Sequence, residues 1–170
     1  FCKNKSKETV SDLGKIQVIA FQGTAGGVGT TTIAASFAVE LADRFQDKSV
    51  CLLDLNVQFG NTAELLDVKS NSKITDAFRN ISRLDIDAFK SLLFEYSDNL
   101  SVFSAPPEVM PLDVLNDDGV EKLIELARSA FACVIIDLPS SIPDWYGKII
   151  VECDELILVS VADVRCAYNA

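Results

Sequence analysis

A glycine-rich segment, residues 23–32, most strongly limits how this chain can fold. It reads Gly-Thr-Ala-Gly-Gly-Val-Gly-Thr-Thr-Thr and lies between an apolar run and the start of a helical pattern. Glycines accept left-handed backbone conformations and let main-chain amides close around an anion, and a following helix start adds free N–H groups. The segment therefore predicts a strand, a phosphate-binding turn and a helix, in that order.

The same segment lacks the lysine that usually neutralises the bound phosphate. Thr30 stands at the lysine position, and Thr31 follows where a Ser or Thr hydroxyl binds Mg²⁺. We predict nucleotide binding with weak or absent turnover, and the alternative is a glycine-rich turn that binds nothing. The residues predicted to contact the nucleotide are Ala25, Gly26, Gly27, Val28, Gly29, Thr30, Thr31 and Thr32.

Short apolar runs alternate with helical patterns along most of the chain. The runs are continuous rather than alternating in hydrophobicity, which is typical of strands covered on both faces. They span residues 16–21, 50–55, 100–103, 131–138 and 156–161. Helical periods lie around residues 33–41, 85–96 and 120–131. This order predicts an α/β fold with a doubly wound, mainly parallel sheet, in which ligands bind beyond the carboxyl ends of the strands.

The ends of the chain differ from its centre. Residues 1–14 are polar and without pattern, so we expect a linker or flexible arm. We expect residues 15–170 to form one nucleotide-binding domain. Its last residues leave little room for the further strand and helices of a complete domain of this type, so the domain is expected to be incomplete at the C-terminus.

Composition narrows the choice of partners. A net charge of −10 argues against direct binding of nucleic acid and leaves only indirect contact with a membrane. No apolar run reaches the roughly 18–20 residues needed to cross a bilayer, so a cytoplasmic protein is expected. The five cysteines lack CxxC spacing and are expected to be structural, and the absence of histidine excludes His-based catalysis and His-ligated zinc.

Two aspartates follow predicted strands. Asp54 comes after residues 50–53, and Asp137 after residues 134–136. A single Asp after a strand is often only a turn former. Two of them in register with the glycine-rich turn predict three strand ends that meet at one crevice, where one acid orders water or metal and the other supports Mg²⁺.

With these motifs the chain resembles the ParA/MinD superfamily of deviant Walker ATPases, and within it the pilus-assembly branch of CpaE/TadZ-like proteins. The resemblance covers residues 16–161. It is carried by the glycine-rich segment, by Asp-Leu-Asn-Val-Gln-Phe-Gly-Asn at 54–61 and by Val-Ile-Ile-Asp-Leu-Pro at 134–139. In that branch the 54–61 pattern resembles the first switch.

The resemblance implies a role for each motif residue. Asp54 would order the attacking water, Asn56 would lie beside it in the first switch, and Asp137 would hold the outer Mg²⁺ shell together with Thr31. Ala25 and Thr30 replace both lysines of the family pattern, including the one that reaches across a sandwich dimer. Lys148 is a candidate replacement cation, although a solvated surface lysine is the favoured interpretation.

The resemblance also implies a biological role. The favoured hypothesis is a protein that binds ATP and Mg²⁺ and forms a homodimer when ATP is bound. The dimer would recruit assembly proteins of a type IV (Flp/Tad-type) pilus or a secretion machine. This recruitment would take place at the cell pole or the inner membrane. The competing hypothesis is a structural pseudo-ATPase that binds no nucleotide. A true phosphoryl-transfer enzyme ranks third, because the phosphate lysine and cluster-forming cysteines are missing.

Overall fold

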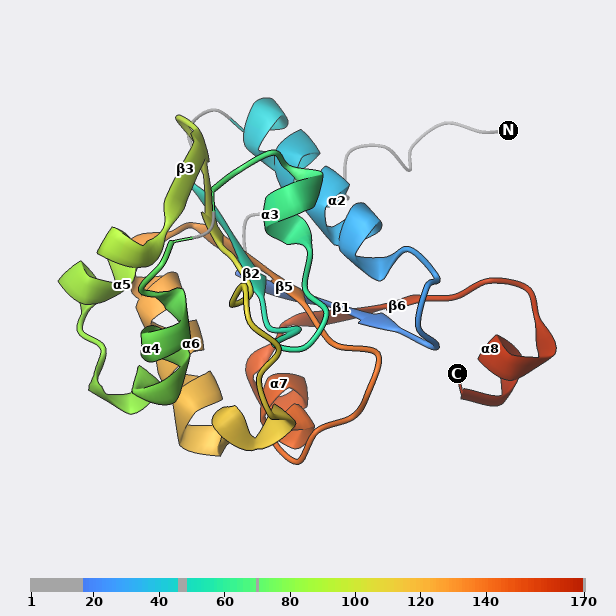
Figure 1. Ribbon diagram of the computed structural model, residues 1–170. Coiled ribbons are helices and arrows are strands. Elements are labelled where there is room, and N and C mark those ends of the chain that lie inside the picture. The colour runs from blue at the N-terminus through green and yellow to red at the C-terminus, as the bar shows by residue number, and fades with distance from the viewer. Residues whose placement is uncertain (1–16, 46–48, 70, 170) are drawn as a thin grey trace.

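Six strands form one sheet, and helices cover both of its faces (Figure 1). The computed structural model describes residues 17–45, 49–69 and 71–169. The expected arm at 1–14 and Cys2 lie outside these ranges. The strands are β1 (Val18–Gly23), β2 (Val50–Asp54), β3 (Phe94–Ser97), β4 (Leu100–Phe103), β5 (Cys133–Asp137) and β6 (Glu155–Val159). The α-helices are α2 (Thr30–Arg44), α3 (Thr62–Leu65), α4 (Ile74–Arg79), α5 (Ile86–Leu92), α6 (Asp117–Ala130), α7 (Tyr146–Glu152) and α8 (Val164–Asn169), and short 3₁₀ helices are η1 (Ile81–Arg83) and η2 (Leu112–Val114).

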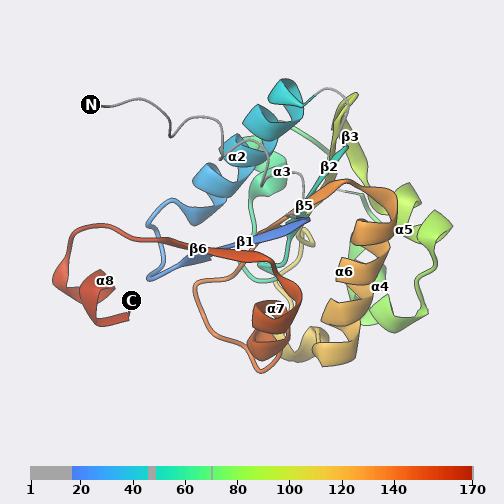
Figure 2. The same cartoon turned by 180° about the vertical axis from the view of Figure 1, so that it is seen from behind.

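The sheet has the predicted mainly parallel topology. Its order is β3-β4-β2-β5-β1-β6, and every neighbouring pair is parallel except β3 with β4. Helix α2 covers one face, whereas α4, α5, α6 and α7 cover the other (Figures 1 and 2). The central strands β1, β2 and β5 are buried along their whole length, as their continuous apolar sequences predict.

Parallel pairing brings three strand ends together. Phe21 of β1 is in register with Asp137 of β5, which in turn is in register with Asp54 of β2. The glycine-rich segment leaves β1 at this same edge and leads into α2, whose alanines at 34, 35, 38 and 42 pack on the sheet. The small side chains let the helix lie close to the strands, which fixes its N-terminus above the strand ends.

One predicted helix was too long. The period over residues 85–96 is helical only to Leu92, and residues 94–97 form β3, which pairs antiparallel with β4. The helix stops because Leu93 is extended, and Asp98-Asn99 then make the tight turn of a hairpin. The apolar spacing of Phe89, Leu93 and Tyr96 fits a helix, whereas the turn residues Asp98-Asn99 indicate a hairpin.

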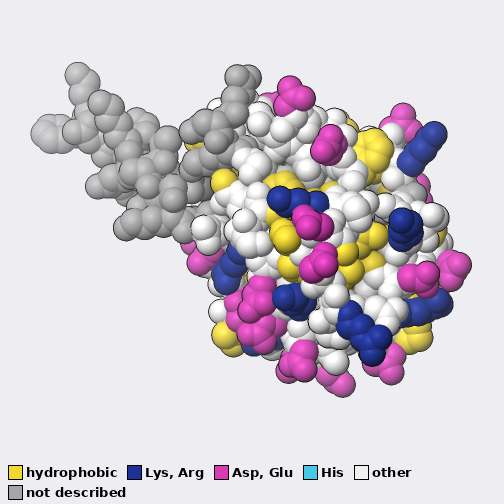
Figure 3. Space-filling view, turned by 90° about the vertical axis from the view of Figure 1, so that its left-hand side faces the viewer, with side chains coloured by type: hydrophobic (Ala, Val, Ile, Leu, Met, Phe, Trp, Pro, Cys, Tyr) yellow, Lys and Arg dark blue, Asp and Glu magenta, His cyan; other side chains and the backbone are white. Residues whose placement is uncertain are grey.

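Surface chemistry agrees with the composition. On the face shown in Figure 3, basic and acidic side chains are interspersed and no broad basic patch is seen. Among the described residues, no helix is long and apolar enough to cross a membrane.

Candidate functional site

A cavity of about 440 Å³ opens where β1, β2 and β5 end. One wall is the glycine-rich segment, which we call the cradle (residues 23–32), and the others are the 55–61 loop after β2 and the 138–145 loop after β5. The predicted site residues that line it are Ala25, Gly26, Gly27, Gly29, Thr30, Thr31, Thr32 and Asn56. The predicted residues Val28, Asp54 and Asp137 are not among its lining residues.

The cradle has the backbone that an anion site needs. Gly27 and Gly29 have φ values of 80° and 90°, a left-handed conformation that favours glycine. Gly29 is the N-cap of the 15-residue helix α2, and no side chain caps it. The first N–H groups of α2 are therefore available to a phosphate at the cavity. Gly26 faces the 138–145 loop, because a Cβ built on it would lie 3.7 Å from the Ser140 hydroxyl.

The Thr30 side chain does not extend toward a bound phosphate as the missing lysine would. A Cβ built on Gly23 would lie only 2.4 Å from the Thr30 hydroxyl, so this side chain rests on the end of β1. Among the residues that the structure describes, no lysine or arginine lines the cavity. A phosphate at this cavity would therefore depend on main-chain amides, hydroxyls and a metal ion for its binding.

Asp137 is a buried carboxylate with unused oxygens. Its side chain is fully buried, and neither oxygen has a hydrogen-bond partner within the described residues. Burial, and secondly the charge of Asp54, raise its pKa to about 7, while the nearby hydroxyl of Thr31 opposes that shift. A carboxylate beside a hydroxyl, with its lone pairs unused, fits Mg²⁺, which prefers oxygen ligands. Asp137 and Thr31 are therefore the residues that would hold the ion.

Unlike Asp137, Asp54 accepts hydrogen bonds through both of its carboxylate oxygens. It is fully buried, its Oδ1 accepts from the Asn56 N–H (3.0 Å), and its Oδ2 accepts from the Thr62 N–H (3.3 Å) and from the Thr62 hydroxyl. Burial raises its pKa to about 6 despite these bonds, which lower it. In this structure Asp54 joins the two ends of the 55–61 loop, and other residues of the motif line the cavity, namely Asn56, Gln58, Phe59 and Asn61. The water-ordering role of Asp54 stays a prediction.

Thr62→Val tests whether Asp54 holds the 55–61 loop. The change keeps the shape of the side chain but removes a donor from a buried carboxylate, so we expect the free energy of unfolding to fall by about 2–3 kcal/mol. Thr75→Val is the matched control, because Thr75 is also buried and its side chain makes no hydrogen bond to another described residue. Denaturant melts of both variants measure the difference, and equal losses would contradict the assigned role.

Gln22 is a site residue that the sequence reasoning missed. Its amide nitrogen donates to the carbonyl of Gly23 (2.9 Å) and to that of Pro139 (3.0 Å), so it ties the cradle to the 138–145 loop. A polar residue at the end of an apolar run was an available signal. The sequence offered no such signal for Thr62, because it reaches Asp54 across the seven residues of the 55–61 loop.

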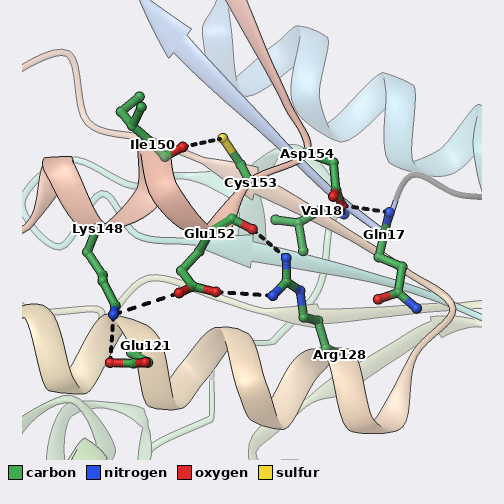
Figure 4. A network of polar contacts seen from close by, with 9 residues as sticks. All are labelled: Gln17, Val18, Glu121, Arg128, Lys148, Ile150, Glu152, Cys153 and Asp154. Carbon is green, nitrogen blue, oxygen red and sulfur yellow. Dashed lines mark hydrogen bonds and ion pairs between the residues drawn. The ribbon is translucent and has the colours of Figure 1, made fainter.

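Lys148 does not supply the missing charge. It lies on α7, where its ammonium binds Glu121 of α6 at 2.8 Å and Glu152 at 3.7 Å (Figure 4). Arg128 of α6 also contacts Glu152, at 3.1 Å. These contacts fasten α7 to α6, and Lys148 is not among the cavity residues. Lys148 is also not the solvated surface lysine that the sequence led us to favour, because its side chain is only 23% exposed and pairs with two glutamates.

Sequence comparison decides the family. The profile described as the CobQ/CobB/MinD/ParA nucleotide binding domain matches residues 19–143, which contain the cradle, the 55–61 loop and Asp137. The chain belongs to this family. The residues matched to the CobQ/CobB/MinD/ParA domain include nearly all of β1 and the whole of β2 and β5, at whose ends the cavity lies.

Individual relatives are more distant. The septum site-determining protein MinD of Helicobacter pylori is 22% identical over 147 residues, covering 86% of this chain and 53% of MinD. The solved ParA family ATPase from Chlorobium tepidum is 24% identical with a TM-score of 0.79, covering 90% of this chain and 64% of that one. MinD from Pyrococcus horikoshii, solved with Mg-ADP, is 16% identical with a TM-score of 0.72, covering 91% and 61%. The chain thus spans about half the length of the curated relatives it matches.

Proposed function

We propose that this protein binds ATP with Mg²⁺ at the cradle, forms a homodimer in that state and acts as a localisation or scaffold protein with weak or no ATP hydrolysis. The observation that carries the proposal is the buried carboxylate of Asp137, whose oxygens lack partners beside the Thr31 hydroxyl. A buried carboxylate without hydrogen bonds lowers the stability of the folded protein unless a cation binds to it. Membership of a nucleotide-binding family supports the same conclusion.

Weak hydrolysis follows from the charges around the cavity. Removing one preorganised donor to a developing anion slows a reaction by about 100- to 1,000-fold, and the lining residues supply no cation. Binding is less affected, because the main-chain amides of the cradle and the metal ion supply much of the attraction. The protein would therefore hold ATP for longer than an efficient ATPase and would serve as a nucleotide-dependent marker.

The cellular role we propose is assembly of a Flp/Tad-type pilus or a secretion machine. Its support is the 54–61 motif, with Gln58 and Phe59 on the cavity wall, together with the replaced lysines. The 76%-exposed Phe59 offers an apolar contact beside the nucleotide, where a second subunit or an assembly protein can meet it.

Calorimetry with MgATP, followed by sedimentation of the same sample, tests this function. Micromolar affinity with a nucleotide-dependent rise in mass supports it. A single observation favours the pseudo-ATPase, namely the absence of Lys and Arg from the lining residues. No heat and an unchanged mass would establish that alternative.

Thr30→Lys is expected to restore turnover. A lysine at this position of the cradle places a cation beside the bound phosphate, so the ATPase rate should rise about 100-fold. Ser36→Lys is the control, since it adds the same charge to the same helix at an exposed position away from the cavity. Phosphate release under saturating MgATP measures both. Tight binding with an unchanged rate in Thr30→Lys would count against the water-ordering role of Asp54.

A further inference from the structure

A second cavity, of about 510 Å³, lies beside the nucleotide site. It is formed by residues 112–118, which contain η2 and the start of α6, and by residues 142–145. Buried Leu115, Pro143 and Trp145 contribute apolar lining, and Ile142 on the edge is 75% exposed. Four exposed carboxylates also line it. They belong to Asp113, Asp117, Asp118 and Asp144, and we call the whole feature the acidic groove.

Among the described residues, the charge of the acidic groove is balanced only in part, by the Lys148 ammonium near Asp117. No lysine or arginine lines it, and none of its four carboxylates forms an ion pair with another described residue. Asp117 and Asp118 are in the first turn of α6, where acids are favoured by the helix dipole. Asp113 lies in the first turn of η2, and Asp144 comes from the 138–145 loop. Together they surround an apolar surface with negative charge.

The 138–145 loop connects the acidic groove to the nucleotide cavity. Its first half, 138–141, lines the cavity, and its second half, 142–145, lines the groove. Trp145 ties the loop to η2, because its indole N–H donates to the Leu112 carbonyl at 3.3 Å. Beyond the loop, α7 is fastened to α6 through Lys148 (Figure 4). A ligand that moves the first half of this anchored loop therefore changes the shape of the groove.

We propose that the acidic groove binds a short basic, amphipathic segment of a partner protein, and that nucleotide in the cradle controls its affinity through the 138–145 loop. The second half of this proposal rests on the proposed function. Charge complementarity selects the occupant, since cationic side chains pair with the carboxylates while apolar ones cover Ile142 and the lining around Trp145. Nucleic acids and anionic membranes are repelled by the same carboxylates. No group of metal-ligating side chains is found among the described residues, which argues against a cation site.

Trp145 is the only tryptophan in the chain and reports directly on the groove. The probe is a peptide with three repeats of Leu-Arg-Lys, and a peptide with Glu at every basic position is its control. We expect the basic peptide alone to change the Trp145 fluorescence saturably. The double change Asp113→Asn with Asp144→Asn should weaken its binding about fivefold to tenfold. Asp43→Asn with Asp98→Asn, which removes two exposed charges elsewhere, should leave the affinity within about twofold.

The apolar half of the groove has its own pair of variants. Ile142→Ser should weaken peptide binding about fivefold, whereas Val151→Ser, at a similarly exposed 77% position on α7, should not. Both side chains are exposed, so unchanged melting temperatures are expected and confirm folding. Equal weakening by the groove and control variants, or equal binding of the acidic peptide, would overturn the proposal.

A last comparison separates the groove from the nucleotide. The titration is repeated with saturating MgATP, and binding of a fluorescent ATP analogue is measured on the same samples. A changed peptide affinity with MgATP supports the coupling. Groove-specific peptide binding without any ATP binding would support the peptide site and contradict the proposed function. ATP binding without groove-specific peptide binding would support the proposed function and contradict the peptide site.

Discussion

Asp137→Asn is expected to make the unliganded protein more stable while weakening its binding of MgATP. The asparagine removes a buried charge whose oxygens have no partners, so the free energy of unfolding should rise by about 2 kcal/mol at pH 8. The same change removes a carboxylate from the proposed Mg²⁺ site, and the affinity for MgATP should fall by about 10- to 100-fold. Urea melts and calorimetry on one preparation measure both effects.

The gain from Asp137→Asn should depend on pH. The pKa of Asp137 is raised from 3.8 to about 7 by burial and by Asp54, so the folded protein keeps a proton that the unfolded chain releases. Between pH 4 and 7 the folded state thus binds more protons, and the wild type should lose stability as the pH rises through this range. The Asp137→Asn variant should lose less stability over this range. At pH 4 its free energy of unfolding should be nearly equal to that of the wild type.

Asp54→Asn provides the contrast for this test. The pKa of Asp54 is also raised, to about 6, so Asp54→Asn also removes a buried charge at pH 8. Asp54 accepts hydrogen bonds from Asn56 and Thr62 that an amide nitrogen cannot accept, so this variant should gain less stability than Asp137→Asn. Millimolar Mg²⁺ should raise the melting temperature of the wild type more than that of Asp137→Asn. Equal stability changes in the two variants, or an unchanged pH profile in Asp137→Asn, would contradict the assigned state of Asp137.

The central part of the fold could be predicted because several local signals agree there. The buried run of β1, the glycines at 27 and 29 and the alanines of α2 each point to a strand, a turn and a close-packed helix. At the 85–96 segment the signals conflict, since apolar spacing suits a helix and Asp98-Asn99 suit a hairpin. The helical spacing alone predicts a helix over the whole segment, but residues 94–97 pair with β4 and form a strand instead.

The sequence predicted the positions of the two aspartates in the sheet but not their contacts. Position after a strand placed both Asp54 and Asp137 at the correct edge. Nothing in the sequence shows that one carboxylate is saturated by Thr62 and the other is left without partners, because that depends on how the 55–61 loop closes. Loop closure also explains why Asn56, rather than Asp54, faces the cavity.

Gly60→Ala should be the most destabilising small substitution in the site. Its new Cβ would lie 2.3 Å from the Cβ of Ala105 and 2.6 Å from both the Asn56 carbonyl oxygen and Asp54 Oδ1. Real Cβ atoms do not approach this closely, and two of the three neighbours are fixed by backbone or by burial, so the loop itself must move. We expect a loss of about 3 kcal/mol in the free energy of unfolding, measured by urea melts. Because the same loop carries Asn56 and Phe59, MgATP affinity should fall as well.

Gly147→Ala is the matched control for this prediction. A Cβ on Gly147 meets no atom within 4 Å, and the residue is exposed on α7, so alanine should raise stability by about 0.5–1 kcal/mol through helix propensity. The two glycine substitutions are thus expected to have opposite signs. If Gly60→Ala were as stable as the wild type, the 55–61 loop would not be pressed against Asp54 as described. The route by which that loop positions Asn56 at the nucleotide cavity would then have to be abandoned.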